Sequence, residues 1–256
     1  METVFVGPAP RLAVSVAGAG ELVIFLHGIG GNRSNWSHQL DVFSRKFKAA
    51  AWDARGYGDS DDYDGPLDFS VFSADLVRVL DFFKCEKAHV IGLSMGGRIA
   101  RNFALVHPER VNRLVLANTQ PGFASLGPEG VKRFVEERKN LDPIAQSAKL
   151  VSARARPGAR EELEASLRAV RRESYLKTVE ASATQDLAAP IERIRAPTLV
   201  ITSEDDRLYP PEIARDMARR IPGARLAVIP DAGHLSNLEQ PERFNDVVLS
   251  FLEKKA

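Results

Sequence analysis

Ser94 stands between two glycines, and this arrangement has the clearest chemistry in the sequence. Residues 92–97 read GLSMGG, a G-x-S-x-G pattern. An apolar stretch at 88–91 has the length of a buried strand, and the residues at 98–106 show a helical pattern. A tight turn from strand to helix lifts a serine Oγ above the sheet edge, where it can attack a carbonyl carbon. The other interpretation is a glycine-rich turn whose serine only caps the helix. The flanking pattern favours a nucleophile.

A nucleophilic serine needs a general base and a carboxylate that orients the base. Of the five histidines, His234 stands in a DAGHL loop just after the last expected strand, and we interpret it as the base. The loop after the strand at 198–202 supplies two adjacent candidates for the acid, Asp205 and Asp206. Adjacent side chains point in different directions, so only one of them is expected to face His234. We favour Asp206, with Asp205 as its rival, and the order serine, acid, histidine agrees with the motif.

The negative charge that develops on a substrate oxygen requires preorganised N–H donors. Met95 follows the serine and offers its backbone N–H at the start of the expected helix, where the helix dipole also favours an anion. Residues 27–32 read HGIGGN and follow the strand at 21–26, and their three glycines let the backbone turn an N–H inward. We expect the Ile29 N–H to be the second donor. A phosphate-binding loop is the alternative, but no G-K-[ST] follows.

The composition excludes several classes of protein. The 256 residues include 35 basic and 34 acidic side chains, so the net charge of +1 does not predict binding to nucleic acid or to a charged membrane surface. The single cysteine, Cys85, excludes an internal disulfide framework and fits a reducing compartment. The first residues lack the pattern of a signal peptide, and no apolar stretch approaches the length that spans a bilayer. We expect a cytoplasmic protein whose partner is a small-molecule substrate.

Strand-length apolar stretches alternate with helical patterns along most of the chain. Helical spacing occurs at 69–83, 211–221 and 241–252. This alternation indicates an α/β fold with a mostly parallel sheet that helices cover on both faces. No helix separates the first two strands, so we predict that they form an antiparallel edge. The strands are expected at 11–17, 21–26, 47–52, 88–93, 113–117, 198–202 and 225–229.

The alternation stops between 120 and 190. This segment contains two charge-rich helical patterns, at 128–139 and 160–179, and no convincing strand. About seventy residues is long for an ordinary crossover. We therefore predict an inserted helical cap at 120–190 that closes over a core formed by 1–119 and 191–256. A decorated crossover is the alternative.

Cap side chains are candidates for substrate contacts. Phe123, Leu126 and Phe134 are expected to line an apolar acyl pocket, unless they only pack the cap onto the sheet. Val135, Leu141 and Ile144 belong to the same group. Four cap arginines are candidates to recognise an acidic substrate, but acidic neighbours at 129, 136, 137 and 161 roughly cancel their charge, and we interpret them as solvated. These arginines are Arg133, Arg138, Arg154 and Arg156.

These residues together resemble the α/β-hydrolase superfamily over essentially the whole chain. The resemblance is closest to its small, capped hydrolases of carboxylic esters and lactones. Residues 27–32 and 53–60 are similar to the superfamily's oxyanion loop and to the turn after its next strand. Residues 233–241, GHLSNLEQP, resemble the histidine region of 3-oxoadipate enol-lactonases.

The resemblance also assigns roles to single residues. It implies that Asp206 is the acid, because the acid of that family stands four residues before a proline, here Pro210. It implies that Asp53 and Arg55 brace the oxyanion loop and do not react.

The predicted function is hydrolysis of a carboxylic ester or lactone through an acyl-enzyme at Ser94, with no metal and no organic cofactor. One alternative keeps the same residues and cleaves a carbon–carbon bond in a vinylogous diketone. A second alternative is a ligand-sensing protein that keeps the fold but turns over slowly.

Overall fold

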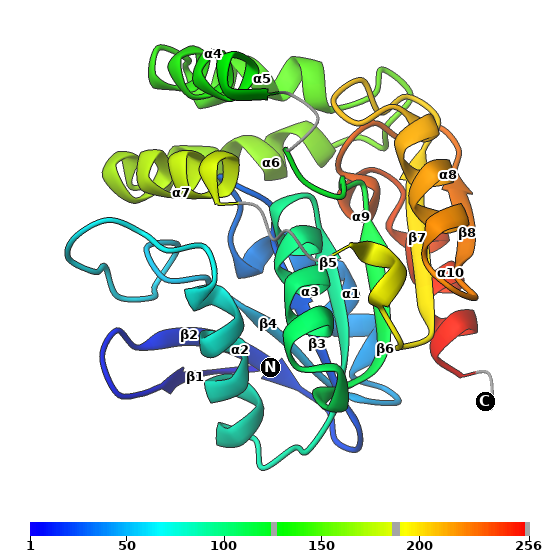
Figure 1. Ribbon diagram of the computed structural model, residues 1–256. Helices are drawn as coiled ribbons and strands as arrows, with labels where there is room; N and C mark the ends of the chain where they lie inside the picture. The colour runs from blue at the N-terminus through cyan, green and yellow to red at the C-terminus, as the bar shows by residue number, and fades with distance from the viewer. Residues whose placement is uncertain (124–126, 186–189, 254–256) are drawn as a thin grey trace.

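A mostly parallel sheet forms the centre of the computed structural model, which describes residues 1–123, 127–185 and 190–253. Within these ranges eight strands run in the order β1-β2-β4-β3-β5-β6-β7-β8 (Figure 1). β2 is antiparallel to both of its neighbours, β1 and β4, and the remaining pairs are parallel. The α/β prediction is thereby confirmed. The strands are β1 (Glu2–Val6), β2 (Leu12–Ala17), β3 (Leu22–Leu26), β4 (Lys48–Trp52), β5 (Ala88–Leu93), β6 (Val111–Ala117), β7 (Thr198–Ser203) and β8 (Arg225–Ile229).

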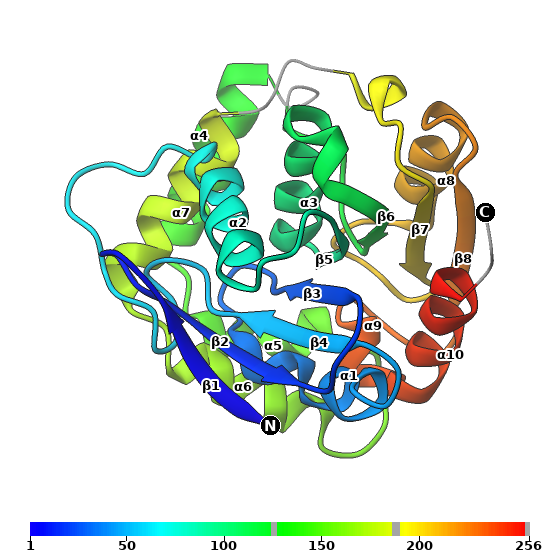
Figure 2. The same ribbon diagram turned by 90° about the horizontal axis from the view of Figure 1, so that it is seen from below.

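Helices cover both faces of the sheet (Figure 2). α2 (Val71–Phe82), α3 (Met95–Val106) and α8 (Pro211–Arg220) share one apolar layer with the strands, and α1 (Ser37–Phe43) and α10 (Pro241–Leu252) share the other. Side chains of the central strands alternate between the two layers, as the pleat requires. The result is a rigid support whose carboxyl-terminal edge can hold reactive groups in place. The short helices of this core are α9 (Ser236–Glu239), η1 (Arg33–Trp36), η2 (Pro108–Arg110) and η4 (Ile191–Arg193).

The antiparallel edge is not the predicted one. We expected 11–17 to pair with 21–26, but β2 pairs with β1 and β4, and β3 lies between β4 and β5. All five residues of β3 are buried, so this strand is stabilised in the middle of the sheet and not at its edge. β1, which completes the edge, is short and largely solvent-exposed, and its sequence pattern is correspondingly weak.

Residues 127–184 form four helices above the carboxyl ends of the strands, at the top of Figure 1. The pattern predicted one helix over 160–179, but the chain forms two, α6 and α7, and α5 was not predicted. No glycine or proline marks the break at 169–171, so the packing of α6 and α7 against different neighbours determines it. We call these four the cap helices: α4 (Gly127–Lys139), α5 (Pro143–Leu150), α6 (Ala159–Arg168) and α7 (Arg172–Thr184).

Over the described ranges no helix has both the length and the apolar character needed to cross a membrane.

Candidate active site

The turn at Ser94 has the geometry that the G-x-S-x-G pattern predicts. Ser94 lies between β5 and α3 with φ of +56° and ψ of −115°, a backbone conformation that costs about 1–3 kcal/mol in a residue with a side chain. A Cβ on Gly92 would meet the Gly96 carbonyl oxygen at 2.1 Å, and one on Gly96 would meet the Leu26 carbonyl oxygen at 2.1 Å. Both glycines are therefore needed for the backbone to close the turn. The surrounding packing holds Ser94 in its strained conformation.

The glycine-rich loop after β3 lies directly against this turn. A Cβ on Gly28 would approach the Ser94 Cβ to 3.2 Å, which shows how closely the loop backbone passes the serine. The Ile29 N–H donates no hydrogen bond to any residue that the structure describes. Met95 is the first residue of α3, so its N–H has no partner within the helix. Both predicted donors thus lie next to Ser94 with N–H groups available to an anion.

Hydrogen bonds of His27 and Asp53 fix the backbone of this loop. The Nδ1–H of His27 donates to the Gly28 carbonyl at 2.8 Å, and its Nε2 accepts from the Ala54 N–H at 3.1 Å. Burial lowers the pKa of His27, so the ring is neutral, as this pair of bonds requires. The Asp53 carboxylate accepts from the Arg33 N–H at 2.6 Å and also binds its guanidinium. The bracing role expected for Asp53 agrees with these contacts.

Arg55 lies elsewhere. Its guanidinium makes two hydrogen bonds of 2.7 Å to Asp75 on α2. It therefore fixes the turn after β4 to α2 and does not contact the glycine-rich loop directly. This bidentate bond and the ion pair that Arg78 makes with Asp75 at 2.9 Å together neutralise a buried carboxylate.

His234 faces Asp206 and not Asp205. The His234 Nδ1 lies 3.0 Å from Asp206 Oδ2, and both residues are buried. The other oxygen, Oδ1, accepts from the N–H groups of Leu208 and Tyr209 at 3.0 and 2.9 Å. Burial acts to raise the pKa of Asp206, but the charge and hydrogen bond of His234 and the Tyr209 N–H outweigh it and hold this pKa below its ordinary value. Asp206 is therefore ionised and can stabilise a protonated His234.

The side chain of Asp205 contacts the residues that follow α5. Its carboxylate accepts from the Ser152 hydroxyl at 2.5 Å and pairs with the Arg154 guanidinium at 2.9 Å. The hydrogen bond from Arg154 lowers the pKa of Asp205. Arg154 is predicted to lie on a solvated face, and it is half-exposed. Through this pair it joins the residues after α5 to the loop that contains Asp205 and Asp206. Residues 205 and 206 thus have separate partners.

Asn118 was not predicted from the sequence. It follows β6 with φ of +45°, and its Nδ2 donates to Asp206 Oδ2 at 3.0 Å and to the Ser203 hydroxyl at 2.9 Å. Its Oδ1 accepts from the Ser236 hydroxyl at 2.6 Å. Asn118 therefore orients the same carboxylate oxygen that His234 binds. Its position in the sequence is the signal that could have identified it. Asn118 is a polar residue directly after β6, the strand that neighbours β5.

Glu239 was also missed, and it fixes the backbone on both sides of His234. This buried carboxylate accepts from the N–H groups of Gly233 at 2.7 Å, Leu235 at 2.9 Å and Ser152 at 2.8 Å. Burial is the largest influence on its ionisation and raises the pKa of Glu239. Because Ser152 follows α5, the same side chain ties the histidine loop to the cap helices.

We expect Glu239→Gln to lower the free energy of unfolding by about 2 kcal/mol or more and to reduce kcat. An amide has only one acceptor oxygen, so at least one buried N–H beside His234 faces an NH₂ group instead. Chemical denaturation and steady-state kinetics at a temperature where the variant is folded measure the two effects. Glu242→Gln, an exposed glutamate on α10, is the matched control. Equal stability and turnover in both variants contradicts this role.

Ser94 and His234 line one small cavity of about 50 Å³. Within the described residues no hydrogen bond joins the Ser94 hydroxyl to the His234 ring, and such bonds are commonly long before substrate binds. This volume is far below the few hundred Å³ of an ordinary ligand site, so a substrate of normal size requires the side chains or helices that line the cavity to move. Apolar side chains form most of the wall: Ile29, Leu93, Leu150, Leu163, Leu167, Leu208 and Leu235.

Two of the three predicted acyl-pocket residues lie away from the Ser94 cavity. Phe123 and Phe134 pack against each other with ring centroids 4.6 Å apart, in an apolar cluster with α7 that also contains Val135. Neither ring lines the Ser94 cavity, because α4 turns its apolar face to α7. Ile144 packs in the layer beneath the cap helices. Leu126 lies outside the described residues.

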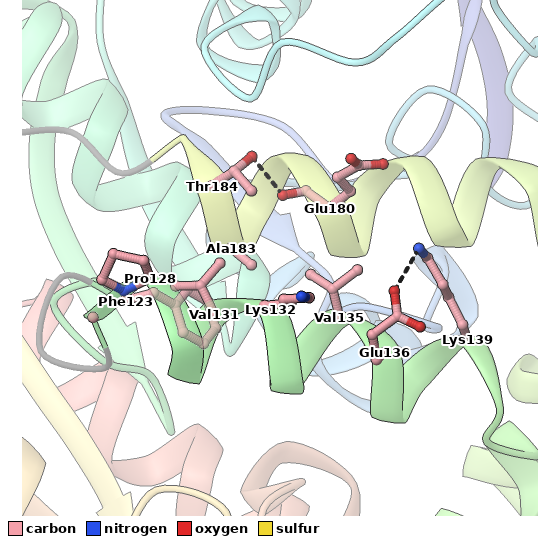
Figure 3. A pocket seen from close by; sticks show the side chains of 11 residues that line it. Phe123, Pro128, Val131, Lys132, Val135, Glu136, Lys139, Glu180, Ala183 and Thr184 are labelled. Atoms are coloured by element: carbon pink, nitrogen blue, oxygen red, sulfur yellow. Dashed lines mark hydrogen bonds and ion pairs between the residues drawn. The ribbon is translucent and has the colours of Figure 1, made fainter.

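A larger cavity, of about 620 Å³, lies between α4 and α7 (Figure 3). Phe123 and Val135 contribute apolar wall, and Lys132, Glu136 and Glu180 bring charge. Neither Ser94 nor His234 borders it. Ser94 and His234 are therefore separate from the larger cavity in this conformation.

The part of the chain that the structure describes contains no group of three or more His, Cys, Asp or Glu side chains arranged to hold a metal ion.

Comparison with known proteins places the chain in a family. Residues 21–241 match the alpha/beta hydrolase fold family, and the protein belongs to that family. It is 31% identical to a putative 2-succinyl-6-hydroxy-2,4-cyclohexadiene-1-carboxylate synthase of Bacillus subtilis, with 94% of each chain covered. It is 29% identical to 3-oxoadipate enol-lactonase 2 of Acinetobacter baylyi, over 91% of this chain and 88% of that one.

A solved structure shows the same likeness. A thermophilic esterase from Thermogutta terrifontis superposes with a TM-score of 0.88 at 27% identity, over 98% of both chains. The similar proteins thus share one fold and carry different activities by name, so the fold alone does not give the reaction.

Proposed function

We propose that this protein hydrolyses carboxylic esters or lactones of small molecules through a covalent acyl-enzyme. The observation that carries the proposal is the arrangement of Ser94, His234 and Asp206. A strained serine with two free N–H groups beside it shares a cavity with a buried histidine, and an ionised aspartate binds that histidine. An esterase and an enol-lactonase among the similar proteins support the same class of reaction.

In this mechanism Ser94 Oγ attacks the substrate carbonyl while His234 Nε2 takes the hydroxyl proton. Asp206 keeps the proton of His234 on Nδ1 and stabilises the imidazolium. The Ile29 and Met95 N–H groups bind the oxyanion. His234 then returns its proton to the leaving alkoxide, and a water molecule repeats the sequence to release the acid.

The domain division has a role in this proposal. Residues 1–119 and 191–256 form the core that holds the reacting groups, and 120–190 form a cap that excludes water and selects the substrate. The small cavity at Ser94 supports a cap that opens to admit substrate and closes during the reaction.

Turnover of short and medium p-nitrophenyl esters beside a panel of lactones tests the proposal. We expect hydrolysis with a burst of p-nitrophenol that reports the acyl-enzyme. A strong preference for lactones narrows the class to lactonases. Cleavage of a vinylogous diketone without ester turnover would instead assign carbon–carbon hydrolysis, and ligand binding with no turnover would assign a sensing role.

A further inference from the structure

One charged side chain, Arg138 of α4, lines the cavity that contains Ser94 and His234. The other described residues of the wall are apolar apart from Ser94, His234 and Tyr175, and none of these described residues is acidic. We interpreted Arg138 from the sequence as solvated, but it is half-buried and turned toward the interior. Its charge therefore acts inside the space where a substrate must bind.

Arg138 has no carboxylate partner within the described ranges. No Asp or Glu oxygen there lies within the 4.0 Å of an ion pair, and no hydrogen bond from its guanidinium is formed. Its closest partner is the Phe134 ring, 3.5 Å from the guanidinium carbon to the ring centroid. Burial lowers the pKa of Arg138, yet a guanidinium stays protonated at neutral pH. Glu137 attracts this cation from beyond ion-pair distance, so the half-buried guanidinium has no bonded counter-charge, and such groups are normally paired.

Other cap arginines do have acidic partners. Arg154 pairs with Asp205 at 2.9 Å, Arg156 with Glu162 at 2.6 Å, and Arg160 with Glu164 at 2.9 Å. Acidic side chains also stand next to Arg138 on α4, but Glu136 and Glu137 are exposed, and Glu136 pairs with Lys139. Arg133 and Arg172 also form no ion pair with a described residue, but both are exposed to water, whereas Arg138 is half-buried.

The charge of Arg138 reaches the surroundings of His234. The Tyr209 ring packs edge-on against the His234 ring with centroids 5.3 Å apart. Burial raises the pKa of Tyr209, while the positive charges of Arg98 and Arg138 oppose that rise. The charge of Arg138 therefore acts close to the Tyr209 ring that packs against His234. An anionic group bound there would lie close to the reacting carbonyl.

We propose that Arg138 binds a carboxylate of the substrate, and that the preferred substrates are esters or lactones with a free carboxylate a few bonds from the reacting carbonyl. This inference rests on the proposed function. The carboxylate supplies the missing counter-charge, and a guanidinium binds it with two parallel hydrogen bonds. The separation is short because Arg138 and Ser94 border the same small cavity.

A matched pair of substrates tests this inference. Mono-p-nitrophenyl glutarate carries a free carboxylate, and methyl p-nitrophenyl glutarate carries a neutral ester in its place. We expect the wild-type kcat/KM to favour the acid, and Arg138→Met to reduce that preference roughly 10- to 100-fold. Arg133→Met, an exposed arginine on the same helix, is expected to keep the preference. Rates measured with Ser94→Ala give the spontaneous background.

Two results overturn the inference: a wild-type enzyme that does not distinguish the two esters, and an Arg138→Met variant that loses both activities equally. Calorimetric binding of the acid ester to Ser94→Ala, with and without Arg138→Met, separates the inference from the proposed function. Binding that weakens roughly 10-fold or more with Arg138→Met supports the carboxylate site even if the wild type hydrolyses nothing. Binding that is the same in both proteins overturns it.

Discussion

Ser94→Ala is expected to reduce kcat/KM for any ester or lactone substrate by roughly 10⁴- to 10⁶-fold. In the proposed mechanism the substitution removes the atom that forms the covalent bond, while the Ile29 and Met95 N–H groups and the cavity remain. Residual turnover therefore reflects only oxyanion binding and the positioning of water. Steady-state kinetics with an activated ester, corrected for the spontaneous rate, measure the loss.

The variant is expected to fold normally, since alanine at 94 has the same backbone conformation to adopt as serine, and Oγ forms no hydrogen bond to the described part of the chain. Thermal unfolding of the two proteins should therefore agree within a few degrees. Ser73→Ala, a buried serine on α2, controls for loss of a hydroxyl from the interior. If Ser94→Ala keeps most of the wild-type turnover, Ser94 is not the nucleophile.

The Ser94 turn was predictable because its chemistry is local. Close approach of Gly92 to Gly96 and of Gly96 to Leu26 requires glycine at these positions, and a short sequence pattern records that requirement. The sheet edge was not predictable in the same way. β2 pairs with β4, which lies more than thirty residues away, and no feature of either strand encodes the partner.

The cap shows where sequence patterns lose information. Helical spacing located α4, but its apolar residues turned out to pack on α7, and the side chain that enters the Ser94 cavity is Arg138. The balance of basic and acidic residues in the sequence predicts the same solvated position for all four cap arginines. Only the packing of α4 over the sheet distinguishes Arg138 from Arg154, because it decides which of them has a carboxylate within reach.

Asn118 and Glu239 were missed for a related reason. Both act through other groups: Asn118 holds Asp206, and Glu239 holds the backbone around His234. Such residues have no motif of their own, since an asparagine or glutamate elsewhere would look the same in the sequence. Their roles become visible only when the structure places the loop that contains Asp206 beside the loop that contains His234.

The adjacent aspartates provide the sharpest comparison within this site. Asp206→Asn is expected to reduce kcat roughly 10³- to 10⁴-fold, because an amide can donate to His234 Nδ1 and so favours the tautomer that cannot accept the serine proton on Nε2. Asp205→Asn removes a partly exposed ion pair with Arg154 and alters the hydrogen bond from Ser152, and it is expected to leave turnover within a few-fold of wild type. Parallel kinetics of the two variants measure the difference. A larger loss in Asp205→Asn than in Asp206→Asn would transfer the acid role to Asp205.

The pH dependence of the free energy of unfolding gives a second test of the contacts of Asp206. The native contacts of Asp206 hold its pKa below the ordinary 3.8, so the ionised carboxylate stabilises the folded state above that pH. This contribution is lost as the pH falls through the lowered native pKa. We therefore expect the stability difference between wild type and Asp206→Asn to shrink as the pH falls below about 4, because Asp206 is protonated first in the unfolded wild type and only at its lower native pKa in the folded state. A difference that stays constant over this range would mean that Asp206 has the same pKa in the folded and unfolded states, which its hydrogen bonds to His234, Leu208 and Tyr209 argue against.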